Sequence, residues 1–222
     1  MSLREQIPLQ FEHESAQCAE NYLVTESNKE AVEWVDRWPS WPSPVIAIYG
    51  PPGAGKTHLG VIFIEKTHAR IPDLSNPTRW IEKPEGPWLI DDFEKFIDRV
   101  GEEALLHFFN SVIEAQGKML LIGRHPPSKW NLLLPDLRSR LLAVISVEIS
   151  SPDDTLLAAV LVKLLKDRQL NVNTEVIMYL LARMERSFTA AGNLVDILDN
   201  LALSERRAIT IPLVKRVLNN WK

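Results

Sequence analysis

Apolar residues in this chain form two kinds of pattern, short continuous runs and longer segments with helical spacing. Continuous runs bounded by turn residues predict buried strands at Val45–Tyr49, Trp88–Ile90 and Met119–Gly123, and an alternating run predicts another at Val144–Ile149. Apolar positions from Glu102 to Gln116 recur every three or four residues, which predicts a helix. Strands that alternate with helices predict an α/β fold with a parallel sheet flanked by helices.

The pattern changes near residue 150, and no strand is predicted beyond it. Pro152, followed by two acidic residues, is typical of a helix start. Helical spacing then predicts four helices, near Asp154–Arg168, Thr174–Arg183, Phe188–Leu203 and Ile211–Asn220. We therefore predict a flexible leader at residues 1–20, a nucleotide-binding α/β domain at 21–150 and a small all-helical domain at 151–222.

The eight residues after the first predicted strand read Gly-Pro-Pro-Gly-Ala-Gly-Lys-Thr, the pattern of a phosphate-binding loop. A helical pattern follows to about Ala69, so the motif has the strand and helix that it requires. The glycines let backbone N–H groups turn toward a phosphate chain, and the helix N-terminus adds a positive dipole end. Lys56 supplies a charge for the β- and γ-phosphates, and the Thr57 hydroxyl suits Mg²⁺. The residues expected to bind the nucleotide here are Gly50, Pro51, Pro52, Gly53, Ala54, Gly55, Lys56, Thr57 and His58.

Two carboxylates follow the second predicted strand, which reads Trp88-Leu89-Ile90-Asp91-Asp92. Ligands bind at the carboxyl ends of strands in open parallel sheets, so this pair should face the phosphate loop. In phosphate-loop proteins an acid from a second strand holds Mg²⁺. We expect Asp91 to organise Mg²⁺ and Asp92 to polarise the attacking water.

Basic residues lie after the third predicted strand and before the fourth. Arg124 and His125 are candidates for sensing a γ-phosphate or for contacting a neighbouring molecule. Arg140 lies in a short predicted helix, Leu137–Leu141, far in sequence from the phosphate loop. A phosphate held by a neighbouring subunit is therefore its natural target, as for arginine fingers that neutralise transition-state charge.

The amino-acid composition indicates which partners this protein can bind directly and in which cellular compartment it is expected. The 222 residues are 45% apolar, enough for a globular core, and carry 25 basic against 29 acidic residues, a net charge of −4. A chain that grips DNA by itself usually carries a basic surplus, so contact with DNA is expected only through a partner. A single cysteine, Cys18, allows no intrachain disulfide, and no apolar signal segment or membrane span is evident. We expect a cytoplasmic protein that does not bind membranes.

Together these stretches resemble the DnaA and Hda family of bacterial AAA+ replication proteins. The resemblance covers roughly residues 9–222 and is carried by Gly50–His58, Trp88–Asp92, Pro126-Pro127, Leu134–Leu141 and Ile209–Val214. DnaA carries a further C-terminal helix-turn-helix domain for DNA binding, and this sequence stops before it. The sequence is therefore more similar to Hda, the regulatory inactivator of DnaA.

This resemblance implies a AAA+ domain with a helical lid, and ATP or ADP with Mg²⁺ bound between them. Arg140 matches the family's arginine finger. Arg186 matches the lid arginine that reaches the nucleotide, and Arg183 remains an alternative. Arg124 departs from the family pattern, where a small polar or acidic residue is usual, and this puts γ-phosphate sensing in cis in question. Asp92 is the usual residue in this branch.

The leader gains a meaning from the same resemblance. Residues 6–11 read Gln-Ile-Pro-Leu-Gln-Phe, similar to the short peptide that docks on the bacterial sliding clamp of DNA polymerase III. Gln6 offers a donor and acceptors, while Leu9 and Phe11 could fill one apolar pocket. An extended peptide with Pro8 loses less freedom on docking. We therefore expect Gln6, Leu9 and Phe11 of the leader to bind the sliding clamp.

The resemblance implies a regulator of replication initiation that binds ATP or ADP, docks on the clamp and promotes hydrolysis of the ATP held by DnaA. Such a chain would be a weak ATPase itself and would activate, in trans, the hydrolysis of ATP by DnaA, and self-association into a homodimer is left open. Two other classes remain: a AAA+ helicase loader that couples its own turnover to assembly on DNA, and a scaffold on the clamp that does not hydrolyse ATP. DNA-stimulated turnover would identify the loader, and indifference to loss of Arg140 would identify the scaffold.

Overall fold

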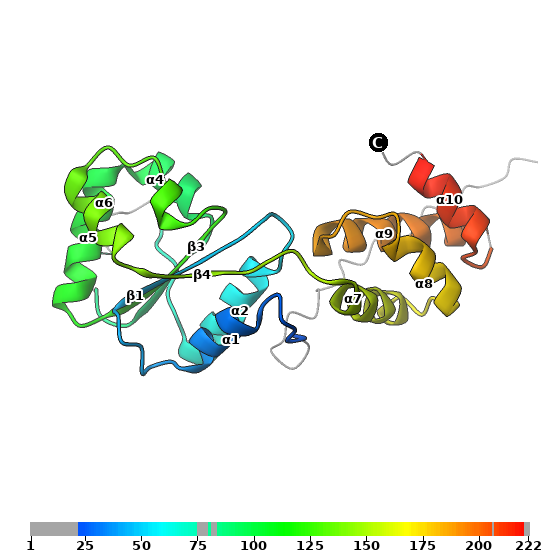
Figure 1. Ribbon diagram of the computed structural model, residues 1–222, viewed down its shortest axis with the longest axis horizontal. Helices are drawn as coiled ribbons and strands as arrows, with labels where there is room; N and C mark the ends of the chain where they lie inside the picture. Colours follow the sequence, from blue (N-terminus) through cyan, green and yellow to red (C-terminus); the bar gives the residue numbers. More distant parts are fainter. Residues whose placement is uncertain (1–21, 75–79, 81–83, 206, 220–222) are drawn as a thin grey trace, which may run out of the picture.

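The computed structural model describes residues 22–74, 80, 84–205 and 207–219. It contains an α/β domain up to about residue 150 and a helical domain from residue 151 onward (Figure 1). The two are joined where β4 runs on toward α7 (Figure 1). No helix among these residues is long and apolar enough to cross a membrane.

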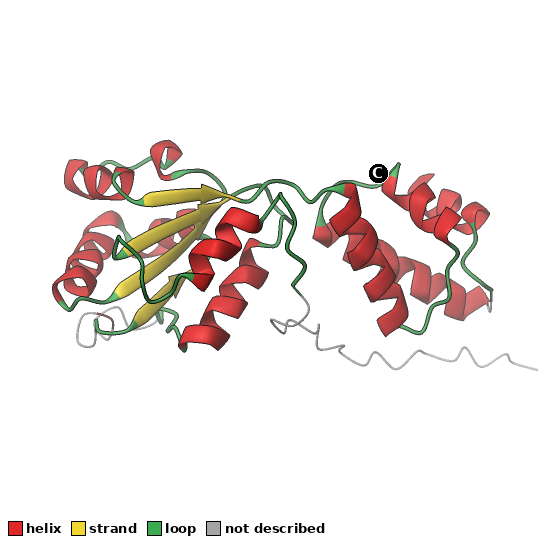
Figure 2. Ribbon diagram, turned by 60° about the horizontal axis from the view of Figure 1, so that its bottom comes forward, coloured by secondary structure: helices red, strands yellow, loops and turns green. Residues whose placement is uncertain are grey.

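Four parallel strands form the sheet in the order β2-β3-β1-β4. They are β1 (Val45–Tyr49), β2 (Pro87–Ile90), β3 (Lys118–Gly123) and β4 (Ile145–Glu148). Helices cover both faces of the sheet (Figure 2), and this explains why the inner strands read as continuous apolar runs. The predicted strands and the parallel α/β fold are confirmed.

One face of the sheet is covered by α1 (Lys29–Asp36) and α2 (Lys56–Thr67), whose buried side chains pack on Ile46, Ile48 and Leu120. The other is covered by α4 (Phe93–Val100), α5 (Glu102–Glu114) and α6 (Pro135–Leu142), the last preceded by a short 3₁₀ turn, η2 (Pro127–Lys129). The sequence analysis did not predict α4, which Gly101 separates from α5 with φ of 83°. A positive φ of this kind favours glycine.

The helical domain has a core of its own. It comprises α7 (Asp154–Asp167), α8 (Thr174–Leu181), α9 (Phe188–Glu205) and α10 (Ile211–Asn219), so all four predicted helices are confirmed. Fully buried side chains include Leu157, Leu161, Leu180, Ala191, Leu198 and Val214. The Asp153 carboxylate caps α7 by accepting a hydrogen bond from the Leu156 N–H at 2.7 Å.

Candidate nucleotide site

The loop between β1 and α2 has the backbone of an anion cradle. Gly53 and Gly55 have φ of 70° and 90°, in the left-handed region that side chains disfavour. Gly55 is the N-cap of α2 and provides no side-chain hydrogen bond, so the first turn presents backbone N–H groups. A Cβ added at Gly50 would lie 2.1 Å from the Ile149 carbonyl oxygen, so only glycine fits beside β4.

Lys56 and Thr57 open α2 at the mouth of this cradle. The Lys56 ammonium donates to the carbonyl oxygens of Gly50 and Pro51, each at 2.8 Å, so it lies folded along the loop. Burial lowers the pKa of Lys56, and the nearby Asp91 charge opposes that effect. Thr57 is exposed in the first helical turn. A phosphate chain laid in the loop would meet a cation, a hydroxyl and the helix N-terminus together.

The acid pair lies where β2 ends, close enough for its charges to act on Lys56. Asp91 accepts a hydrogen bond from the Asp92 N–H at 2.8 Å, which fixes its carboxylate at the strand end. Asp92 has φ of 50° and is the N-cap residue of α4. Its carboxylate pairs with Lys95 one turn on and has the Arg124 Nε at 3.9 Å.

The tip of β3 is tied to the same helix end by Glu94. Its carboxylate accepts the N–H of Arg124 at 2.9 Å and the N–H of His125 at 3.0 Å. The His125 ring nitrogen Nδ1 lies 3.4 Å from the same carboxylate. Lys56, Asp91, Asp92 and Arg124 are therefore gathered at one edge of the sheet, where parallel sheets bind ligands. Glu94 was not among the residues predicted for the site.

The helical domain closes onto the loop through the start of α9. The Phe188 N–H donates to the Gly53 carbonyl oxygen at 2.8 Å. A Cβ at Gly53 would lie 2.6 Å from the Ser187 Cβ, and one at Gly55 would lie 2.9 Å from the Phe188 ring. The glycines thus also allow close packing between the two domains. The sequence analysis identified neither Ser187 nor Phe188, because no motif marks them.

Comparison with known proteins identifies the family of the lid and the fold of the chain. A family model of the Hda lid domain matches residues 154–218, which span α7 to α10. Domain III of the replication initiation protein DnaA from Thermotoga maritima superposes with a TM-score of 0.76, over 90% of this chain and 95% of that one, at 19% identity. The chain is therefore Hda-like in its lid, and it has the fold of the DnaA-related AAA+ ATPases.

Two further solved structures share this fold, and one further protein is similar in sequence. AMPPCP-bound DnaA from Aquifex aeolicus matches with a TM-score of 0.65 at 23% identity, over 84% of this chain and 68% of that one. The Holliday junction branch migration motor RuvB from Thermotoga maritima matches with a TM-score of 0.70 at 15% identity, over 91% and 71%. An uncharacterised protein of Haemophilus influenzae is 31% identical over 190 residues, covering 79% of this chain and 82% of that protein.

The two lid arginines considered from the sequence contact other parts of the lid. Arg186 pairs with Asp154 at the start of α7, at 3.1 Å. The Arg183 guanidinium lies over the Tyr179 ring, 3.9 Å from its centroid. The lid instead approaches the phosphate loop through Ser187, Phe188 and Thr189. Assignment of Arg186, or of Arg183, to the nucleotide stays a prediction that requires the lid arginine to leave its present partner.

Three aromatic side chains, Tyr22, His58 and Phe188, lie beside the phosphate loop of this AAA+ domain. The rings of Tyr22 and His58 meet edge to face, with centroids 5.2 Å apart. Burial raises the pKa of the Tyr22 phenol to about 12. The Phe188 ring lies across the loop at Gly55. Aromatic rings next to a phosphate cradle suit the base of a nucleotide.

The residues expected to hold Mg²⁺ fit that ion. Among the described residues, no group of three or more His, Cys, Asp or Glu could hold a metal by itself. Mg²⁺ normally takes few protein ligands and binds through water and substrate phosphates. The Thr57 hydroxyl and Asp91 would hold the ion, which would neutralise charge on the phosphates when bound.

Arg140 lies on α6, a helix that is set apart from α2 and the phosphate loop in Figure 1. In Figure 1, α6 lies beside α5 at the end of the AAA+ domain away from the lid, whereas α2 lies at the end next to it. The Arg140 Nε lies 3.1 Å from the Asp136 carboxylate one turn earlier, and its side chain is 40% exposed. The Glu102 carboxylate accepts the N–H groups of Leu133 and Leu134 and so holds the segment that leads into α6.

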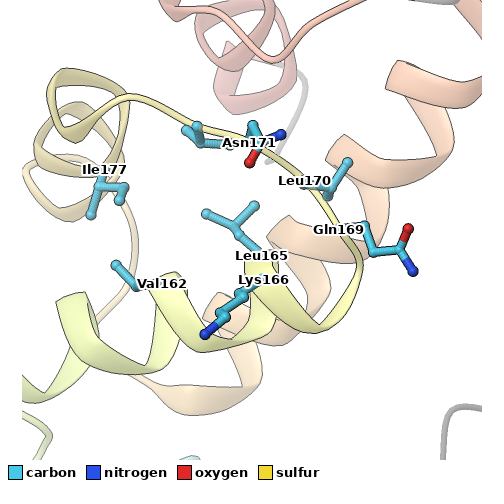
Figure 3. A pocket seen from close by; sticks show the side chains of 8 residues that line it. Val162, Leu165, Lys166, Gln169, Leu170, Asn171 and Ile177 are labelled. Atoms are coloured by element: carbon cyan, nitrogen blue, oxygen red, sulfur yellow. The ribbon is translucent and has the colours of Figure 1, made fainter.

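The lid also has an open hollow of about 430 Å³ between α7 and α8 (Figure 3). Its lining is largely apolar, with Lys166 among the polar residues, and includes Val162, Leu165, Leu170, Val172 and Ile177. None of these residues takes part in the nucleotide site.

The clamp-binding residues predicted in the leader, Gln6, Leu9 and Phe11, lie outside the described residues.

Proposed function

We propose that this chain promotes hydrolysis of the ATP bound to DnaA, and so returns the initiator to its ADP form. The observation that carries the proposal is the exposed side chain of Arg140 on α6, a helix at the end of the AAA+ domain away from the lid (Figure 1). There the guanidinium is available to a second molecule. Arginine binds phosphate oxygens through a planar fork of donors, which suits a finger that acts in trans.

The chain's own nucleotide has a different role in this proposal. ATP or ADP would bind through Gly50–Thr57, with Mg²⁺ held by Thr57 and Asp91. The Phe188 hydrogen bond to Gly53 supports this role, because it joins the lid directly to the loop that would hold the phosphates. Since a ligand that binds only the folded state stabilises it, the bound nucleotide would favour the folded chain with its lid in place.

The proposal is tested by adding the purified chain to ATP-loaded DnaA in the presence of the clamp loaded on DNA. We expect it to speed phosphate release from DnaA in a single-turnover assay. The reaction transfers the γ-phosphoryl group to water, and a correctly placed finger is worth about 10³–10⁵ in rate. Unchanged phosphate release, with both proteins folded and loaded, would contradict the proposal. DNA-stimulated hydrolysis by this chain alone would support the helicase-loader class instead.

Clamp docking is a separate part of the proposal and rests on residues 6–11. We expect replacement of Gln6, Leu9 and Phe11 by Ala to abolish clamp binding, because the replacements remove the amide and both apolar anchors. Folding and nucleotide affinity should not change, since the nucleotide site is built from Tyr22 and residues that follow it. The measurement is a pull-down on the clamp, with Gln10→Ala as a matched control. Equal retention of the triple variant and the parent chain would show that the motif does not bind the clamp.

A further inference from the structure

Arg124 points its charge at Asp92. The Arg124 Nε lies 3.9 Å from Oδ1 of Asp92, while Lys95 pairs with Oδ2 of the same carboxylate. Oδ1 is shielded from solvent and accepts no hydrogen bond within the described residues. Each oxygen of the acid expected to polarise water thus faces a cation.

The backbone around this pair is held in place. Glu94 binds the N–H groups of Arg124 and His125, which fixes the tip of β3 against the start of α4. A Cβ at Gly123 would lie 3.0 Å from Oε2 of Glu94, so a side chain there would displace the carboxylate. The Asp92 N–H is bound by Asp91, which also restrains the acid. The geometry that brings Arg124 to Asp92 therefore follows from several side-chain contacts.

We propose that Arg124, assisted by Lys95, acts as a brake on this chain's own ATP hydrolysis by holding Asp92 in an ion pair. Arg124 is a positioning residue, because it acts through Asp92. The inference rests on the nucleotide-binding part of the proposed function and adds a reason why the chain keeps its nucleotide while Arg140 serves another molecule.

The reaction that the ion pair would slow is the hydrolysis of ATP bound to this chain. A water oxygen forms a bond to the γ-phosphorus, and the bond from that phosphorus to the bridging oxygen breaks, with its electron pair leaving on ADP. Asp92 accepts the water proton and passes it to the released phosphate. An Asp92 carboxylate that is engaged by Arg124 and Lys95 is less free to orient toward the attacking water and accept its proton, so the ion pair slows this transfer.

The first test is single-turnover hydrolysis of ATP by this chain, with no DnaA present. We expect Arg124→Gln to raise the rate by roughly tenfold, which is less than the full contribution of about 10²–10⁴ from general acid–base catalysis because Lys95 still pairs with Asp92. Arg124→Lys should stay near the parent rate, because it keeps the charge. Adding Asp92→Asn to Arg124→Gln should lower the rate again, because it removes the proton acceptor. The matched control is Lys129→Gln, which removes a positive charge from the 3₁₀ turn that follows Arg124 and should leave the rate unchanged. An unchanged or lower rate in Arg124→Gln would overturn the brake.

Calorimetry with ATP and with ADP separates the brake from a sensor. A brake leaves both affinities of Arg124→Gln within a few-fold of the parent values. A selective loss of ATP affinity would mean that Arg124 binds the γ-phosphate, and this would overturn the inference. If Arg124→Gln does not fold, Lys95→Gln replaces it and should raise the rate in the same direction, whereas an unchanged rate there would count against the brake.

The ion pair itself is tested without nucleotide. Thermal unfolding of the nucleotide-free parent, Arg124→Gln, Asp92→Asn and the double variant forms a cycle, and interacting residues give non-additive shifts. Additive shifts would remove the physical basis of the brake. The outcomes distinguish this inference from the proposed function. If the chain does not stimulate ATP hydrolysis by DnaA, the proposed function is wrong. If the chain binds ATP but Arg124→Gln hydrolyses it at the parent rate, only the brake is wrong.

Discussion

Arg140→Ala is expected to lower the stimulated rate of ATP hydrolysis by DnaA about 10³-fold, while this chain still folds and binds nucleotide. The Arg140 side chain is 40% exposed on α6. Among the described residues, its ion-pair partner is Asp136. Its removal therefore costs little stability, because an exposed pair within one helix contributes little. The measurement is single-turnover phosphate release from ATP-loaded DnaA with clamp on DNA.

Two variants sharpen this result. Arg140→Lys keeps the charge but cannot copy the planar fork, so it should lose most of the stimulation. Arg138→Ala is the matched control, because residues two apart on a helix do not share a face. Full stimulation by Arg140→Ala would exclude the trans finger and favour a scaffold that bridges clamp and partner.

Lys56→Ala is expected to weaken ATP and ADP binding by about 10- to 100-fold. The change removes the ammonium that now bonds the carbonyl oxygens of Gly50 and Pro51 at 2.8 Å, where it can move to a phosphate. A hydrogen bond to a charged group contributes about 1.5–3 kcal/mol, and 1.4 kcal/mol corresponds to a tenfold change in affinity. Titration calorimetry measures the loss directly.

Thermal unfolding gives an independent view of the same variant. Nucleotide at about 100 times its Kd should stabilise the parent chain by about 2.7 kcal/mol and should stabilise Lys56→Ala by less. Lys66→Ala is a suitable control, since Lys66 lies on the same helix and pairs with Asp36 at its far end. Equal nucleotide affinity in Lys56→Ala and Lys66→Ala would sink the assignment of the phosphate loop.

Local patterns in the sequence predicted most of the secondary structure. The apolar run Val45–Tyr49 is β1, and the glycine loop with its helix follows directly, because strand burial and helical spacing are properties of neighbouring residues. The lid helices were found in the same way, and the cap at Asp153 marks where α7 begins. Helix α4 was missed, since it follows Asp92 directly and is only eight residues long.

The contacts that shape the site depended on the tertiary structure. Glu94 binds the backbone of Arg124, 30 residues later in the chain, and Phe188 of the lid bonds Gly53 of the loop. Arg186 pairs with Asp154 rather than with the loop, although its position resembles that of a nucleotide-binding lid arginine. The sequence by itself determined the phosphate loop, the acid pair and the helical lid, because each is written in consecutive or helically spaced residues. Which charges face Asp92, and which lid residues meet the loop, was decided only by packing between segments distant in the chain.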